Sequence, residues 1–311
     1  ITSRFGRFSG DKMIEVIEKT EDMRNRVGLI KARGQTIGFV PTMGALHDGH
    51  LSLIRRARAE NDSVILSIFV NPIQFDRNDD FLNYPRQLER DLDLASGEDV
   101  DVVFAPGAAD MYPEGYSTYV EVACSLTRGL CGASRPGHFG GVATVVTKLF
   151  NIVRPDRAYF GQKDLQQVAV IKKLVKDLEM DVDVVALPTV RDADGLATSS
   201  RNQRLTNKER QTALSIYKAL ERARELSISG EISTKVFVKE MRDILKKAGI
   251  IRIDYVSVVD PETLEEPDQA YPEAVAAVAA WVGSTRLIDN TALGVGPEPK
   301  LFLQYKTQTV S

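Results

Sequence analysis

The amino-acid sequence predicts an α/β fold, in which a mostly parallel sheet flanked by helices is followed by a smaller α+β domain. Short apolar, β-branched runs alternate with helical patterns between residues 36 and 187, an order typical of βαβ units. After Pro188 the order changes to two helical patterns followed by three strand-like runs. We therefore expect a domain boundary near Val190. The expected division is a first domain at 13–189 and a second at 190–294, with 1–12 and 295–311 left unassigned.

The strands of the first domain are predicted from runs of apolar and β-branched residues. The clearest run, SVILSIFV at 63–70, is almost continuously apolar, as expected for a strand buried within a parallel sheet. Helices are predicted where apolar residues recur every three to four positions. In chain order the expected elements are strand 36–40, helix 51–57, strand 63–70, helix 88–95, strand 100–104, helix 142–153, strand 157–160, helix 165–178 and strand 182–187.

The second domain is predicted to begin after a turn-rich connector, RDADG at 191–195. Thr206 and Glu209 have the spacing of a capping box, in which each side chain satisfies a free backbone N–H at the start of a helix. A helix is therefore expected to begin at Thr206. The remaining expected elements are a helix at 233–247 and strands at 253–259, 274–282 and 285–288.

Composition limits the classes of function that remain. The 311 residues carry a formal charge of -3, and the lack of a basic excess argues against a nucleic-acid-binding role. The longest apolar run, at 274–282, is far shorter than the ~20 residues that a bilayer span needs. Two cysteines, Cys124 and Cys131, are too few for a disulfide framework and are expected to be reduced thiols. We expect a cytoplasmic protein that binds neither nucleic acid nor a membrane.

The first candidate site is His47-Asp48-Gly49-His50, between a predicted strand and a predicted helix. At a helix N-terminus, residues three apart share a face, and the free N–H groups add positive potential. Such a position suits the phosphates of a nucleotide, to which imidazoles can donate hydrogen bonds. The alternative is a polar first turn with surface histidines. A zinc site is less favoured, because only one further histidine exists and no cysteine lies nearby.

The second candidate site is Gly161-Gln162-Lys163-Asp164, which also follows a strand and precedes a helix. Lys163 is a compact charge suited to a phosphate, and Asp164 could cap the helix or bind a ribose hydroxyl. Gln166 and Gln167 follow on the first helical turn. The spacing of a Walker loop is absent, so a plainly capped surface helix remains the alternative.

Two loops complete the set of candidates. Thr198-Ser199-Ser200-Arg201 offers hydroxyls and a guanidinium between the two domains, where a loop could close on a triphosphate. Asn71-Pro72-Ile73-Gln74-Phe75 follows the buried strand at 63–70, and its Gln74 is suited to orienting a small polar substrate. Taken alone, the loop at 198–201 is better explained as a solvated loop, and the turn at 71–75 is equally well explained as a turn with one exposed amide.

The motifs PTMGALHDGH at 41–50, NPIQF at 71–75, GQKDLQQ at 161–167 and SSRN at 199–202 occur in this order. With them the chain resembles the pantothenate synthetases (pantoate–β-alanine ligases), a family of the nucleotidyltransferase superfamily, over residues 13–294. The resemblance implies a Rossmann-like first domain, a C-terminal domain that acts as a lid, and a homodimer. It also implies a two-step reaction with ATP and Mg²⁺, in which pantoate is adenylated and β-alanine then displaces AMP.

The resemblance assigns roles to particular residues. His50, His47 and Lys163 are expected to be catalytic and to contact phosphates. Gln74 and Gln167 are expected to bind pantoate, with Gln74 also near β-alanine. Asp91 is expected to bind Mg²⁺. The expected ATP site comprises Met43, Gly44, Ala45, Leu46, His47, Asp48, Gly49, His50, Gly161, Gln162, Lys163, Asp164, Val190, Thr198, Ser199, Ser200 and Arg201, and further pocket residues are expected at Asn71, Tyr84, Arg135 and His138.

One departure and two rival interpretations remain at this stage. The family usually has Met where this chain has Thr198, so we expect altered packing of that loop on the nucleotide. A nucleotidyltransferase that keeps the nucleotide on its product shares the H-x-G-H motif, but gives no reason for Gln74 and Gln167. A tRNA-binding module is disfavoured by the net charge of -3.

Overall fold

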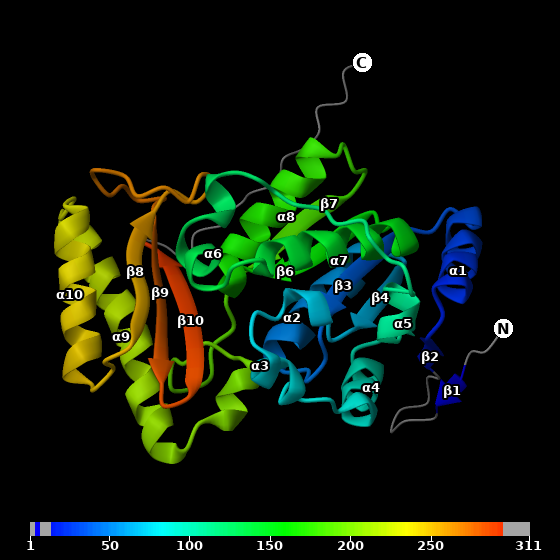
Figure 1. Ribbon diagram of the computed structural model, residues 1–311, viewed down its shortest axis with the longest axis horizontal. Helices are drawn as coiled ribbons and strands as arrows, with labels where there is room; N and C mark the ends of the chain where they lie inside the picture. The colour runs from blue at the N-terminus through cyan, green and yellow to red at the C-terminus, as the bar shows by residue number, and fades with distance from the viewer. Residues whose placement is uncertain (1–3, 7–13, 295–311) are drawn as a thin grey trace.

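The computed structural model describes residues 4–6 and 14–294, which form two sheets (Figure 1). The larger sheet has the strand order β1-β2-β5-β4-β3-β6-β7, and all of its neighbouring strands are parallel except the edge pair β1 and β2. The smaller sheet is antiparallel, with the order β10-β9-β8. The strands are β1 (Arg4–Gly6), β2 (Ile14–Ile17), β3 (Ile37–Thr42), β4 (Ser63–Ile68), β5 (Val102–Phe104), β6 (Arg157–Gly161), β7 (Asp183–Leu187), β8 (Ile253–Val259), β9 (Val275–Val282) and β10 (Thr285–Ala292).

Helices cover both faces of the larger sheet. On one face, α1, α7 and α8 contribute to a core with Phe39 and Phe104, and on the other face α2 and α4 pack around Tyr159. The principal helices are α1 (Thr20–Ala32), α2 (Asp48–Glu60), α4 (Leu88–Gly97), α7 (His138–Val153), α8 (Leu165–Asp177), α9 (Asn207–Ile228) and α10 (Thr234–Lys247). Shorter helical segments are η1 (Pro72–Gln74), α3 (Asn78–Leu82), α5 (Ala108–Met111), η2 (Ser125–Thr127), α6 (Leu130–Ser134), η3 (Gln162–Asp164) and η4 (Ser200–Arg204).

The predicted α/β class is confirmed, including the Rossmann-like parallel sheet and the small second sheet. β4 lies between β3 and β5, and five of its six residues are buried, as its apolar sequence predicted. The capping box of Thr206 and Glu209 is present at the start of α9. None of the helices in the described part of the chain is both long and apolar enough to cross a membrane.

The structure also contains elements that the sequence did not reveal. β1, β2 and α1 were missed, because the strands have only three and four residues and α1 buries only Met23, Val27 and Ile30 among many charges. β1 falls within the head, 1–12, that was left unassigned; the rest of that head and the tail at 295–311 lie outside the described residues. Helix α7 begins at His138 rather than at 142, since packing overrides the low helix propensity of Gly140 and Gly141. Strand β10 continues beyond 288 to Ala292, because it pairs with β9 along its whole length.

The strand order creates a crevice at the carboxyl ends of β3 and β6. β3 pairs with β4 on one side and with β6 on the other. The helix that follows β3, α2, packs on one face of the sheet, whereas α8, which follows β6, packs on the opposite face. The connections therefore diverge at the carboxyl ends of β3 and β6. In open parallel sheets such a divergence leaves the crevice in which ligands bind.

The C-terminal part lies beside this crevice. Helices α9 and α10 pack against each other and against the three-stranded sheet (Figure 1). Strand β10 contacts η3, which follows β6 of the larger sheet, and η4, which lies in the segment before α9. The segment between β7 and α9 joins the two parts and carries the loop at 198–201 that was singled out from the sequence.

Candidate active site

The two histidines of the H-x-G-H motif stack against each other at the start of α2. His47 is the N-cap residue, and its ring centroid lies 4.0 Å from that of His50. Gly49 permits this packing, because a Cβ there would lie 3.0 Å from two atoms of the His47 ring. The Nδ1 atoms of both rings are buried and have no hydrogen-bond partner in the described structure. Two unsatisfied imidazole nitrogens at a helix N-terminus are what a site for an anionic ligand would contain.

The loop before the motif is held by Asp91. Gly44 and Ala45 have positive φ angles, 80° and 51°. This turn directs the N–H groups of Ala45 and Leu46 to the Asp91 carboxylate, at 2.8 and 2.7 Å. A Cβ on Gly44 would lie 2.9 Å from Asp91 Oδ2, so the close approach requires glycine. Asp91 therefore fixes the backbone that leads into the histidine pair.

Burial and Lys163 keep both histidines neutral. Burial, reinforced by the Lys163 charge, lowers the pKa of His47 to about 4. Burial, together with His47 and Lys163, lowers the pKa of His50 well below its usual value. At neutral pH the rings are therefore uncharged hydrogen-bonding groups. The positive charge of this part of the site comes from Lys163 and the helix N-terminus.

Acidification below pH 6.5 is expected to destabilise the ligand-free protein. The third histidine, His138, also has its pKa lowered to about 4, by burial and by Arg135. Between about pH 6.5 and pH 4, the unfolded chain binds protons on histidines that stay neutral in the folded state, so the free energy of unfolding falls as pH falls. Each such histidine contributes up to about 1.4 kcal/mol per pH unit. Urea unfolding at pH 7.0, 6.0 and 5.0 measures this slope.

The matched variant for this measurement is His138→Gln, which removes one of the three groups. Its free energy of unfolding should depend less steeply on pH than that of the wild type over the same range. An unchanged slope in His138→Gln would show that His138 does not contribute to this dependence.

Gln74 is oriented by a contact within its own turn and by contacts with two other segments. Its Oε1 accepts a hydrogen bond from Asn71 Nδ2 at 3.0 Å, and its Nε2 contacts Met43 Sδ at 3.1 Å. Its carbonyl oxygen lies 2.7 Å from His138 Nδ1. Helix α7 approaches this turn closely at Gly141, where a Cβ would lie 2.4 Å from the carbonyl oxygen of Ile73. The Gln74 amide is thus held at the carboxyl end of β4, beside the histidine pair's loop.

The loop after β6 brings Lys163 to the same crevice. Gly161–Asp164 continues directly from β6 into η3 and α8. Lys163 Nζ lies 3.8 Å from the Asp164 carboxylate, which is longer than a direct hydrogen bond. Gln167 lies on the first turn of α8 and lines the same cavity. The lysine charge is therefore presented to the cavity.

The loop at 198–201 is tied to both parts of the protein. Thr198 Oγ1 donates to Asp192 at 2.7 Å, and the Thr198 N–H donates to Val190 O at 2.9 Å. The threonine that departs from the family pattern thus binds the loop to its own connector. Arg201 Nη2 lies 2.9 Å from Asp80 Oδ2. Burial acts to raise the pKa of Asp80, but Arg201 and Arg204 lower it overall.

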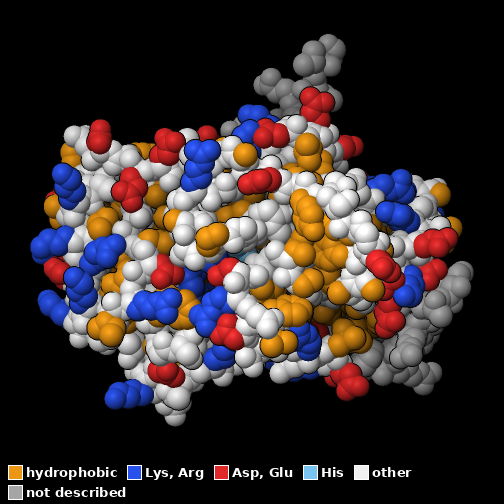
Figure 2. Space-filling view, in the orientation of Figure 1, with side chains coloured by type: hydrophobic (Ala, Val, Ile, Leu, Met, Phe, Trp, Pro, Cys, Tyr) orange, Lys and Arg blue, Asp and Glu red, His pale blue; other side chains and the backbone are white. Residues whose placement is uncertain are grey.

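These segments enclose one cavity of about 220 Å³ at the carboxyl ends of β3 and β6. It continues into a wider cleft of about 570 Å³ toward the three-stranded sheet, beside which Lys and Arg side chains gather (Figure 2). The candidates that line the cavity are Met43, His47, Gly49, His50, Asn71, Gln74, Tyr84, Arg135, His138, Gly161, Lys163, Asp164, Gln167, Val190, Thr198, Ser199, Ser200 and Arg201. Its wall does not include Gly44, Ala45, Leu46, Asp48, Asp91 or Gln162.

Asp91, the expected Mg²⁺ ligand, is hydrogen-bonded to the loop before the histidines. Asp91 is 1% exposed, both of its carboxylate oxygens accept backbone N–H groups, and it is absent from the cavity wall. Within residues 4–6 and 14–294, no group of three or more His, Cys, Asp or Glu side chains could hold a metal ion. In this structure Asp91 holds the loop before the histidines, and its assignment to Mg²⁺ stays a prediction.

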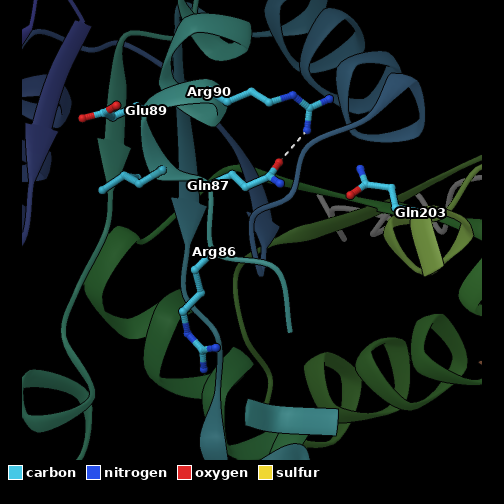
Figure 3. Close-up of a pocket in the computed structure, with 6 residues that line it drawn as sticks. Arg86, Gln87, Glu89, Arg90 and Gln203 are labelled. Carbon is cyan, nitrogen blue, oxygen red and sulfur yellow. Dashed lines mark hydrogen bonds between the residues drawn. The ribbon is translucent and has the colours of Figure 1, made fainter. Parts of the chain in front are cut away.

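A second depression of similar volume, about 570 Å³, lies outside this site (Figure 3). Its side chains point in different directions, and the only hydrogen bond drawn joins Arg90 and Gln87, at 2.8 Å. It is an open surface with no group of converging polar atoms. The residues that line it are Arg86, Gln87, Leu88, Glu89, Arg90 and Gln203.

The sequence analysis missed the apolar wall of the cavity. The apolar side chains of α7 that line it are Val142, Val145, Val146 and Leu149. Their i, i+3, i+4, i+7 spacing was visible, but the same spacing predicts any helix that faces a core. The contacts of Asp289 and Asn290 with the site loops were also missed, because β10 was expected to end before them.

A parallel sheet that carries paired histidines after one strand and a lysine loop after its neighbour defines a nucleotide-binding enzyme of the nucleotidyltransferase superfamily. The profile of the pantoate-β-alanine ligase family matches residues 15–292. The chain belongs to this family.

Relatives with this name cover most of the chain. The pantothenate synthetase of Moorella thermoacetica is 54% identical over 282 residues, which are 91% of this chain and 99% of that protein. The pantothenate synthetase of Thermotoga petrophila is 53% identical over 281 residues, which are 90% of this chain and 100% of that protein.

Solved structures agree with the assignment. Pantothenate synthetase from Thermus thermophilus superposes with a TM-score of 0.86 at 44% identity, covering 90% of this chain and 99% of that one. Pantoate-β-alanine ligase from Francisella tularensis, in complex with β,γ-ATP and β-alanine, superposes with a TM-score of 0.77 at 37% identity. That match covers 92% of this chain and 100% of the other.

Proposed function

We propose that the protein condenses pantoate with β-alanine to form pantothenate, in an ATP-dependent reaction that passes through pantoyl adenylate and releases AMP and pyrophosphate. The observation that carries this proposal is the convergence of the histidine pair, Lys163 and Gln74 on one cavity, in a chain of the pantoate-β-alanine ligase family. The name of the family states which two molecules are joined, pantoate and β-alanine. The cavity contains imidazoles and a lysine suited to an anionic nucleotide, and a glutamine amide suited to a polar acid.

The chemistry needs no nucleophile from the protein. In the first step a pantoate carboxylate oxygen attacks the α-phosphorus of ATP, and the bond to the bridging oxygen breaks to release pyrophosphate. In the second step the β-alanine amine attacks the acyl carbon, loses a proton, and displaces AMP. The enzyme has to position the reactants and stabilise negative charge on the phosphates. Neutral imidazoles and a lysine in a largely buried cavity are suited to this task.

The proposed roles are those that the family resemblance implies, and all of the side chains concerned line the cavity. His47, His50 and Lys163 contact the phosphates, and Asp164 lies near the ribose. Gln74 and Gln167 bind pantoate, with Gln74 also near β-alanine. Val190 lies against the adenine ring. The loop Thr198, Ser199, Ser200 and Arg201 closes on the triphosphate from the C-terminal part, residues 190–294, which we propose acts as a lid on residues 13–189.

Three further features complete the proposal. Mg²⁺ accompanies ATP as the counter-ion of its phosphates, because such ions need few protein ligands beyond the substrate itself. The protein works as a homodimer, as the family resemblance implies, and sedimentation velocity measures this. It acts in the cytoplasm on the small molecules pantoate, β-alanine and ATP.

The deciding experiment is pyrophosphate release from ATP with pantoate, with and without β-alanine. The proposal requires pantoate-dependent release of pyrophosphate, equal amounts of AMP and pyrophosphate once β-alanine is added, and a new amide product. If pantoate releases no pyrophosphate while another acceptor becomes nucleotidylated, the protein is instead a nucleotidyltransferase that keeps the nucleotide on its product.

Replacing Gln74 by Ala is expected mainly to raise the KM for pantoate. The substitution removes the amide that faces the cavity, and losing hydrogen bonds to a charged group costs about 1.5–3 kcal/mol, or roughly 10- to 100-fold in affinity. Steady-state kinetics with pantoate and ATP varied in turn separate the two substrates. A change confined to the KM for ATP would contradict the proposed role of Gln74 in binding pantoate.

A further inference from the structure

Strand β10 of the three-stranded sheet makes direct contact with the loop that bears Lys163. Asn290 lies near the end of this strand and is 5% exposed. Its side-chain nitrogen, Nδ2, donates to the carbonyl oxygens of Gln162 and Lys163, at 3.0 and 2.9 Å. The two hydrogens of one amide group thus reach two consecutive carbonyls of a loop that belongs to the other sheet.

The preceding residue ties the connector to the same strand. Asp289, which is 4% exposed, pairs with Arg191 through contacts of 2.6 and 3.2 Å. Arg191 follows Val190, which lines the cavity. The Asp289 carboxylate also accepts the backbone N–H of Asn290 at 2.8 Å, so the Asp289 side chain is fixed against the backbone of Asn290. Strand β10 therefore contacts both the loop that bears Lys163 and the connector that bears Arg191.

We propose that Asn290 is a positioning residue for Lys163 in adenylate formation. The Lys163 side chain has no close ion pair in the described structure, since its contact with Asp164 is 3.8 Å. The place of its ammonium group therefore depends on the backbone of residues 162 and 163, which Asn290 fixes. A displacement of about 1 Å at a site that acts by positioning can cost ~10²-fold in rate. Through this contact the C-terminal part helps to set the geometry of the phosphate site.

The Asn290 amide can be tested specifically, because a substitution can remove its N–H donors and keep its shape. Aspartate has nearly the same shape as asparagine, but its carboxylate has no N–H to donate and would face two carbonyl oxygens. Asn290→Asp should therefore release the loop without creating a cavity. This inference rests on the proposed function, because the experiment that tests it measures the rate of the adenylation half-reaction.

The experiment measures the two half-reactions separately under single-turnover conditions. Asn290→Asp is expected to slow pantoate-dependent pyrophosphate release by roughly 10- to 100-fold, with little change in the KM for pantoate. Aminolysis of pantoyl adenylate by β-alanine should be nearly unchanged, because it breaks no phosphoanhydride bond. Equal slowing of both half-reactions would overturn the proposal, since it would indicate a general loss of folded enzyme.

Asn61→Asp provides a matched control. Asn61 is also a buried amide, and its Nδ2 donates to Ala57 O and Tyr159 Oη at 2.8 and 2.7 Å. It lies between the end of α2 and the start of β4, and it is not part of the cavity wall, although its partner Tyr159 is. Asn61→Asp should lower thermal stability without selectively slowing adenylation. A selective effect equal to that of Asn290→Asp would also overturn the proposal.

A double-variant cycle tests whether Asn290 acts through Lys163. Asn290→Asp should have little further effect on adenylation in a Lys163→Ala background, because the group it positions is absent. A full additional loss in that background would show that Asn290 acts independently of Lys163. The proposed function itself is tested separately, with the wild-type enzyme. If the wild-type enzyme releases no pyrophosphate with pantoate, the proposed function is contradicted, whatever the variants do.

Discussion

Replacing His50 by Ala is expected to slow pantoyl adenylate formation by roughly 10²–10³-fold, the usual scale for losing one donor that stabilises developing charge. His50 lies at the third position of α2, stacked on His47, and its Nδ1 has no partner among the described residues. Because its pKa is well below the usual value, the ring acts as a neutral donor. Pyrophosphate release in a single turnover measures the effect.

The neighbouring variant Ser52→Ala serves as its control. Ser52 Oγ donates to the carbonyl of Gly49 within the same helix, at 2.8 Å, and Ser52 is not part of the cavity wall. Its adenylation rate should stay close to that of the wild type. A near-wild-type rate for His50→Ala would remove His50 from its proposed role on the phosphates.

Gly141→Ala is expected to lower kcat/KM for pantoate by about two orders of magnitude, since a ~1 Å shift of a positioning group can cost that much. The added Cβ would lie 2.4 Å from the carbonyl oxygen of Ile73 and 2.6 Å from Gln74 Cα. Both are backbone atoms, so the turn that carries Gln74 must move. Overpacking of this kind also destabilises a protein by about 1–3 kcal/mol. Steady-state kinetics and thermal unfolding measure the two effects.

The adjacent glycine gives a matched control. Gly140 lies in the same helix, and a Cβ there would meet no atom within 4 Å. Gly140→Ala should keep the KM for pantoate and gain up to about 1 kcal/mol of stability from helix propensity. If Gly141→Ala binds pantoate as well as Gly140→Ala does, the Gln74 turn does not depend on this close approach.

Local patterns in the sequence were sufficient to predict most of the longer helices and strands of the fold. The apolar run of β4 and the capping box of α9 are properties of a few neighbouring residues, and both are present. Helix α1 was missed because few of its residues are buried, and the start of α7 was missed because two glycines lower helix propensity. In both cases tertiary packing supplies the stability that the local sequence lacks.

Local sequence also predicted that the two histidines of the H-x-G-H motif lie together, since residues three apart at a helix start share a face wherever the helix lies. The backbone contacts of Asp91 show the limit of this reasoning. A carboxylate in a helix gives no sign of its partners, and only the packing of α4 against the loop after β3 brings it to two backbone N–H groups. The partners of Asn290 are equally invisible in the sequence.

By itself, the sequence determined the alternation of strands and helices, the polar turns after two strands, and, through the resemblance of four motifs, the family. Only the tertiary structure decided which groups meet. The pairing of β3 with β6 brings together turns that are distant in the chain, and β10 closes on one of them from the other sheet. The physical reason is that propensity and capping act over a few residues, whereas contacts across sheets depend on how the buried apolar faces of all the elements pack at once.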